Sequence, residues 1–272
     1  MSQYPVPIPK MITSAANDEV KRLRALHERK FRKQSGWFLA EGTRICHEAM
    51  DLGWSMHRLA FVAGREDDQQ VKRLLAGLVT AKGRALPITQ SLMQRISRKD
   101  NPQIVLGAFG QRWDDLNHID ARKNETWVAL DRVRDPGNLG TVMRSADAVG
   151  ASGLILIGDC TDPYSVEAVR ASMGAVFNTR IIVCSEPAFL KFAAGWQGRI
   201  LGTALPAAID YQKADYNRPL IMLMGNEQSG LTDNLMEACS QLIKLPMLGR
   251  SDSLNLAVAT GVVLYEALSR RR

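Results

Sequence analysis

Three short segments in the second half of the chain combine turn residues with polar side chains that could do chemistry. They are 131–145 (DRVRDPGNLGTVMRS), 225–231 (GNEQSGL) and 245–257 (LPMLGRSDSLNLA), and each begins at or just after an apolar run typical of a buried strand. Ligands of open parallel sheets bind beyond the carboxyl ends of the strands. The three segments therefore predict one ligand site at such an edge.

The first segment offers a cationic side chain at a strand-to-helix turn. Asp135, Pro136, Gly137 and Asn138 are turn-forming residues, and we expect Asn138 to cap the helix that follows. Arg144 then lies two turns into this helix, where it could stabilise negative charge. A surface ion pair is the commoner role of a single arginine, so both interpretations stay open.

The second segment is a glycine-bounded loop with one carboxylate, Glu227. Gly225 and Gly230 permit a close backbone approach to a ligand or a turn with positive φ. A plain strand-to-helix turn, with Thr232 capping the next helix, would have the same pattern.

The third segment leads into the last apolar helix through Ser253 and Asn255. Ser253 could be the N-cap of that helix. Asn255 is expected just inside the helix, between Leu254 and Leu256, where a buried amide needs a hydrogen-bond partner.

Several classes of protein are excluded by missing patterns. The sequence contains no G-x-G-x-x-G turn, no G-x-x-x-x-G-K-[ST] loop and no G-x-S-x-G elbow. Its four cysteines and four histidines show no metal-binding spacing, so we expect reduced thiols and no metal site. No apolar run approaches the ~18 residues of a membrane span, and prolines occupy the place of a signal sequence, which predicts a cytoplasmic protein.

Positive charge is concentrated in the first half. Residues 1–112 hold 19 lysines and arginines against 10 acidic residues, whereas residues 113–272 hold 16 against 18. Such asymmetry favours a polyanionic partner for the first half. The densest basic run contains one acidic residue, Glu28. This run is a candidate RNA-binding surface, or else a solvated helix face. Its members are Lys21, Arg22, Arg24, Arg29, Lys30, Arg32 and Lys33. Trp37 and Phe38, which follow, could stack on bases or lie in the core.

The elements that must position these residues form an α/β fold in two domains. In residues 1–110, helices are predicted to alternate with strands. The first helix is expected over 17–33 with Asn17 as its N-cap, and the strands are expected at 36–40, 57–62, 84–88 and 104–109. A polar linker is predicted over 111–125. The domain over 126–272 is expected to hold a mainly parallel six-stranded sheet covered by helices, because its strands read as continuous apolar runs; they are 126–130, 154–157, 180–183, 199–202, 220–224 and 242–245.

Taken in order, the three segments resemble the three motifs of the SpoU, or TrmH, family of RNA ribose 2′-O-methyltransferases in the SPOUT superfamily. The resemblance covers residues 131–266, and the upstream run NDEVKRLRAL…GWFLAEGTR resembles a substrate-binding domain of the ribosomal protein L30e type. The resemblance implies a trefoil-knotted C-terminal domain and S-adenosylmethionine as the cofactor. It also implies a homodimer whose sites are completed across the interface, and a structured RNA substrate, with ribosomal RNA favoured over transfer RNA. A catalytically inactive RNA-binding or ribosome-assembly protein of the same fold is the alternative.

The resemblance also implies roles for individual residues. Arg144 corresponds to the catalytic arginine, supported by Asn138, Glu227, Ser253 and Asn255. Arginine has a pKa above ~12, so stabilising a 2′-oxyanion suits it better than acting as a base. The residues implied in cofactor binding follow the last three large strands: Thr203, Ala204, Leu205, Gly225, Asn226, Glu227, Ile243, Leu245, Met247, Leu248, Ser253, Leu254 and Asn255. Asp252 and Ala257 depart from the Glu and Ser common in the family.

Overall fold

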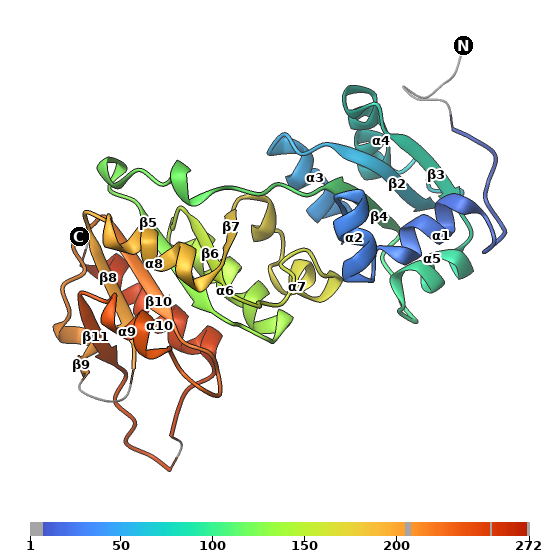
Figure 1. Ribbon diagram of the computed structural model, residues 1–272. Helices are drawn as coiled ribbons and strands as arrows, with labels where there is room; N and C mark the ends of the chain where they lie inside the picture. The colour runs from blue at the N-terminus through green and yellow to red at the C-terminus, as the bar shows by residue number, and fades with distance from the viewer. Residues whose placement is uncertain (1–7, 205–207, 251, 271–272) are drawn as a thin grey trace. The chain divides into compact units, whose positions relative to one another are not determined.

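The computed structural model (Figure 1) describes residues 8–204, 208–250 and 252–270, with the backbone alone at residue 80. The chain divides into two compact units, Met1–Gln111 with Tyr164–Phe177, and Arg112–Pro163 with Asn178–Arg272. This division differs from the predicted boundaries in two respects. Residues 164–177 join the first unit, and most of the predicted linker belongs to the second.

The first unit is built on a four-stranded sheet with the order β1-β4-β2-β3. Strand β4 is antiparallel to both of its neighbours, and β2 pairs parallel with β3. The predicted strands match to within one residue, because each is a short apolar run between polar turns; the strands are β1 (Trp37–Glu41), β2 (Met56–Val62), β3 (Arg84–Ile88) and β4 (Val105–Gly110).

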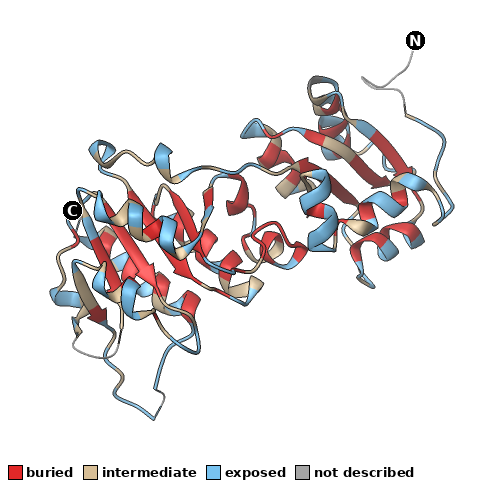
Figure 2. Ribbon diagram, in the orientation of Figure 1, coloured by how far each residue is buried: buried red, intermediate tan, exposed pale blue. Residues whose placement is uncertain are grey.

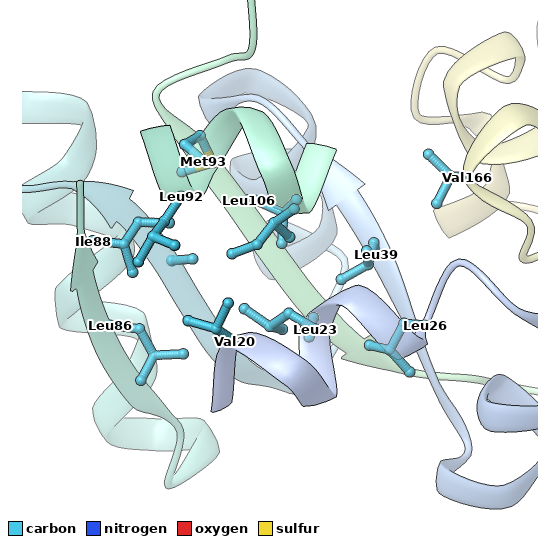
Figure 3. Packing of buried hydrophobic residues seen from close by; sticks show 13 residues of the cluster. Val20, Leu23, Leu26, Leu39, Leu86, Ile88, Leu92, Met93, Leu106 and Val166 are labelled. Atoms are coloured by element: carbon cyan, nitrogen blue, oxygen red, sulfur yellow. The ribbon is translucent and has the colours of Figure 1, made fainter. Parts of the chain in front are cut away.

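Among the described residues, six α-helices belong to this unit: α1 (Asp18–Ala25), α2 (Arg29–Ser35), α3 (Thr43–Asp51), α4 (Gln69–Ala81), α5 (Gln90–Ser97) and α7 (Val166–Ala171). Val20, Leu23 and Leu26 place one apolar face of the α1 region against the core in Figure 3. Val166 of α7 belongs to the same cluster and is 3% exposed.

The segment 164–177 completes the core of the first unit although it lies in the second half of the sequence. The rings of Tyr164 and Phe177 lie 4.6 and 5.7 Å from that of Phe38, centroid to centroid. Trp54 Nε1 donates a hydrogen bond of 2.8 Å to the carbonyl of Phe177. Burial of these aromatic side chains explains why the segment is grouped with β1.

The continuous helix predicted over 17–33 is wrong, because the chain breaks between Ala25 and Arg29. Asn17 caps α1 as predicted, accepting from the Glu19 amide at 2.9 Å. At the other end, Arg32 Nη1 donates to the carbonyls of Leu26 and His27 at 2.9 and 2.8 Å. The guanidinium satisfies the carbonyls that end the first helix, so a second helix can start there.

The second unit holds a parallel sheet with the order β7-β6-β5-β10-β8-β11-β9. The prediction of a mainly parallel sheet is confirmed, but it has seven strands among the described residues where six were expected. The extra strand, β9, spans two residues and is too short to show a hydrophobic pattern. The strands are β5 (Thr126–Asp131), β6 (Gly153–Ile157), β7 (Arg180–Cys184), β8 (Arg199–Thr203), β9 (Ile209–Asp210), β10 (Leu220–Met224) and β11 (Gln241–Lys244).

Helices cover this sheet: α6 (Pro136–Ala148), α8 (Glu186–Ala194), α9 (Asp233–Glu237) and α10 (Leu256–Ser269). Helices α6 and α10 pack against each other. Strand β10 lies between β5 and β8, so segments that are distant in the sequence emerge side by side from one edge of the sheet. No described helix is long and apolar enough to cross a membrane.

Candidate active site

The carboxyl ends of four neighbouring strands, β5, β10, β8 and β11, define the candidate site. The Ala204 amide donates to the Ile243 carbonyl at 3.0 Å, and the Gly225 amide donates to Thr203 Oγ1 at 3.4 Å. Four of the residues implied in cofactor binding are thereby brought into contact. Leu205 lies outside the described residues.

Asn138 connects the three sequence segments through its side chain. Its Nδ2 donates to Glu227 Oε1 at 3.2 Å, and its Oδ1 accepts from Asn255 Nδ2 at 2.9 Å. The partners lie 89 and 117 residues further along the chain. Three of the side chains implied in catalysis thus form one hydrogen-bonded chain.

The helix caps differ from the predicted ones. Asp135, not Asn138, caps α6, and its Oδ1 accepts from the Asn138 amide at 2.6 Å. Asn138 is therefore in the first turn, with its side chain available to Glu227 and Asn255. Asn255, not Ser253, caps α10, accepting from the amides of Ala257 and Val258 at 2.9 and 3.3 Å. Its amide is exposed and has partners at both ends, so the expectation of a buried position inside the helix is wrong.

The loop that carries Glu227 is shaped by Asn226 and two glycines. Asn226 Oδ1 accepts from the amides of Gln228 and Ser229, and its Nδ2 donates to the Arg132 carbonyl at 2.8 Å. A Cβ at Gly225 would lie 2.7 Å from the backbone of Gly230 and Leu231, and Gly230 has φ of +68°. Only glycine fits at position 225, because backbone atoms cannot move aside as a side chain can.

Two further residues of the first segment belong to the site and were not singled out from the sequence. Asp131 is 1% exposed and accepts from Arg132 Nε and Nη2 at 2.9 and 2.8 Å. The hydrogen bonds to Asp131 raise the pKa of the Arg132 guanidinium. Arg132 has φ of +49°, which aims its carbonyl at Asn226. An Asp-Arg pair at the end of a buried strand was the available signal.

Arg144 is not part of this hydrogen-bonded chain. Its side chain is exposed on α6, and its guanidinium makes no hydrogen bond or ion pair with any described residue. Ser253 is exposed as well. The structure thus brings together Asn138, Glu227 and Asn255 and leaves the arginine apart from them within one chain.

The remaining residues suit the cofactor that the resemblance implies. Leu245 and Met247 are half-buried, and Leu248 and Leu254 are 99% and 39% exposed. Exposed leucines beside backbone amides and tight glycine turns suit a ligand with both apolar and polar parts. Among the described residues, no group of three or more side chains could hold a metal ion.

The basic run of the first unit does not act as one surface. Arg24, Arg29, Lys30 and Lys33 are exposed, and Lys21 and Arg22 are exposed but lie 3.5 Å from Asp18 and Glu19 respectively. Arg32 is 3% exposed and supports the backbone, which contradicts its prediction as an RNA-binding residue.

The two aromatic residues after the basic run are not available for stacking. Phe38 is buried. The Trp37 ring stacks on His57, with centroids 4.5 Å apart, and the Arg58 guanidinium lies over it at 5.0 Å.

Comparison with known proteins agrees with this geometry. Residues 125–265 match the SpoU rRNA Methylase family, and residues 17–107 match the MRM3-like substrate binding domain. The chain belongs to the SpoU rRNA methylase family. The resemblance inferred from the three motifs is confirmed, as is the presence of a substrate-binding domain before them.

Relatives that share both halves are similar over nearly their whole length. A 23S rRNA (uridine(2479)-2′-O)-methyltransferase of Streptomyces viridochromogenes is 32% identical, over 90% of this chain and 87% of its own. A 23S rRNA (guanosine(2553)-2′-O)-methyltransferase of Bacillus subtilis is 26% identical, over 94% and 98%. The AdoMet-bound rRNA methyltransferase of Sinorhizobium meliloti is 43% identical, with a TM-score of 0.91 over 96% of this chain and 98% of that one.

Proposed function

We propose that this protein transfers a methyl group from S-adenosylmethionine to a ribose 2′-hydroxyl of ribosomal RNA, and that it acts in the cytoplasm. The observation that carries the proposal is the Asn255–Asn138–Glu227 chain, which joins the three family motifs at one edge of the sheet. The inactive alternative has less support, because a protein released from catalysis has no need of this arrangement. The named activities of the full-length relatives favour ribosomal over transfer RNA.

The cofactor, when bound, supplies an electrophilic methyl group. The residues that would hold it lie at the carboxyl ends of β8, β10 and β11 or after them: Thr203, Ala204, Gly225, Asn226, Glu227, Ile243, Leu245, Met247, Leu248, Ser253, Leu254 and Asn255. Backbone groups of the tight loops would bind its polar parts, and the leucines its apolar parts.

Arg144 would act on the ribose by electrostatics. Its guanidinium would stabilise the negative charge that develops on the ribose 2′-oxygen and would hold the adjacent phosphate. Asn138 and Asn255 would hold Glu227 in one orientation, and alignment of the reacting groups supplies a large part of such a rate enhancement.

The site would be completed in a homodimer. Val258, Val262 and Tyr265 are 53%, 36% and 55% exposed on α10, at spacings of four and three residues that place them on one face. A second copy covering this apolar stripe would remove it from water. Arg144 lies on α6, which packs against α10, and would then reach the RNA ribose bound at the site of the second copy. This would account for the absence of an interacting group for its guanidinium among the described residues of one chain. The knot implied by the resemblance stays a prediction.

Calorimetric titration with S-adenosylmethionine, followed by tritiated methyl transfer to unmodified total RNA and mapping of the labelled ribose, tests the proposal. Cofactor binding and one 2′-O-methyl site in ribosomal RNA are expected. Labelling of transfer RNA alone would correct the substrate, and no cofactor binding would favour the inactive RNA-binding protein.

A further inference from the structure

One aromatic side chain in the basic run remains open to solvent. Phe31 is 42% exposed, whereas Phe38 is buried and the Trp37 ring is covered by His57 and Arg58. Exposure of the apolar phenylalanine ring to water is unfavourable, and contact with a flat apolar partner would remove part of this free-energy cost.

Helix α2 presents Phe31 on a rigid support. Arg32 is its one buried residue, and the other six are exposed. Most of this helix is accordingly pale blue in Figure 2. The Arg32 guanidinium ties α2 to the end of α1, and Gly36, with φ of +68°, ends the helix. The position of Phe31 is therefore set by a buried anchor in the next residue.

The charge around Phe31 is positive. Arg29, Lys30 and Lys33 of the same helix are exposed. Glu28, the one acidic residue of the run, lies 3.3 Å from Arg98 at the end of α5. His27 Nε2 donates to the Ile96 carbonyl at 2.6 Å, which holds the end of α5 beside the start of α2. Because Glu28 is paired with Arg98, it does not offset the positive charge of Lys30 and Lys33, which can attract a polyanion.

We propose that Phe31 stacks on an unpaired base of the RNA substrate while Lys30 and Lys33 contact its phosphates. The inference rests on the proposed function, because it assigns a contact for the same RNA. Aromatic rings surrounded by cations are the means by which proteins bind unpaired nucleotides, since stacking serves any base and the cations serve the backbone. A continuous duplex offers no such base, so the contact selects a single-stranded region.

The test measures fluorescence anisotropy of labelled oligouridine and of a blunt RNA duplex, as a function of salt. Phe31→Ala and Phe31→Leu are expected to weaken oligouridine binding on the order of tenfold, with the salt dependence and duplex binding unchanged. Phe31→Tyr should bind as the unmodified protein does. Lys30→Ala and Lys33→Ala should instead lower the salt slope by about 0.7 each.

Leu52→Ala is the matched control, because Leu52 is an apolar side chain of the same unit with 41% exposure. Unchanged oligouridine affinity in both Phe31 variants, or equal losses for oligouridine and duplex, would overturn the proposal. So would a changed sedimentation coefficient with unchanged RNA affinity, which would assign Phe31 to a protein contact. If the unmodified protein labels ribosomal RNA while the Phe31 variants bind oligouridine normally, this inference alone fails and the proposed function stands.

Discussion

At the scale of single residues, the amide of Asn138 has a role that neither a carboxylate nor an alcohol could fill. It donates to Glu227 and accepts from Asn255 at the same time, which requires one NH₂ and one carbonyl in a fixed plane. Aspartate would place an acceptor against Glu227. The residue type is therefore dictated by its two partners.

Asn138→Ala should lower the rate of methyl transfer on the order of 100-fold. Glu227 and the start of α10 would lose their common hydrogen-bond partner, so the reacting groups would lose their alignment. The melting temperature should change little, since the side chain lies near the surface. Steady-state kinetics and thermal unfolding measure the two effects. Thr141→Ala, one turn further along α6, is the control and should retain activity.

Arg144→Ala should abolish transfer and leave the calorimetric affinity for S-adenosylmethionine near that of the unmodified protein, because the guanidinium acts on the ribose. Arg122→Ala removes another exposed arginine from the same unit and should be active. A large loss of cofactor affinity in Arg144→Ala would show that the arginine holds the cofactor instead.

At the scale of elements, the break between α1 and α2 depends on one buried guanidinium. Arg32→Met keeps the aliphatic stem but loses two hydrogen bonds to carbonyls. We expect the free energy of unfolding to fall by roughly 2–3 kcal/mol, since bonds to charged groups are strong and the carbonyls are left unsatisfied. Lys33→Met, at an exposed position, should change it by less than about 0.5 kcal/mol. Urea denaturation compares the two.

The attachment of residues 112–125 to the sheet of the second unit is sensitive to acid. Asp114 accepts from Arg180 Nε and His118 Nδ1, each at 2.6 Å. Burial alone would raise the pKa of Asp114, but the hydrogen bonds from Arg180 and His118 outweigh it and lower the pKa. The folded protein therefore favours the charged carboxylate.

A lowered pKa in the folded state stabilises the protein above the unfolded value of about 3.9, and the stabilisation is lost as the pH falls through the folded pKa. Asp114→Asn should thus be less stable than the unmodified protein at pH about 6. The difference in urea midpoint should shrink below pH about 4. A difference that is constant with pH would assign the effect to packing.

At the scale of the whole molecule, the sequence order and the structural units do not coincide. The chain leaves the second unit after Pro163, supplies Tyr164 and Phe177 to the core of the first, and returns at Asn178. Arg170 and Lys99 also hold Glu41, at 2.7 and 2.9 Å, where that carboxylate is 5% exposed. The family-matched catalytic region is thus needed to complete the substrate-binding unit.

Val258→Arg should convert the proposed dimer into monomers and abolish transfer, because a charge in the α10 stripe cannot be buried without a partner. Sedimentation velocity and methyl transfer measure the result. Val183→Arg is the control, since Val183 is equally apolar and 51% exposed on β7. A Val258→Arg protein that stays dimeric would place the interface elsewhere.

The sequence alone determined most of the strands and the class of chemistry. Strands and helices follow from local apolar periods and turn residues, which is why the strands of both units begin and end within a residue or so of the predicted positions. The three motifs named the family and the cofactor class, and they contain Asn138, Glu227 and Asn255, which meet at the strand ends, because residue types at short spacings carry that information.

The tertiary structure decided which partner each side chain has. Several features depend on contacts outside the local sequence. They are the burial of Arg32, the roles of Asp135 and Asn255 as caps, the grouping of 164–177 with the first unit and the addition of β9. Asn138 joins residues 89 and 117 positions away. Hydrogen bonds and burial are set by neighbours in space, and no local pattern encodes which distant residues those neighbours are.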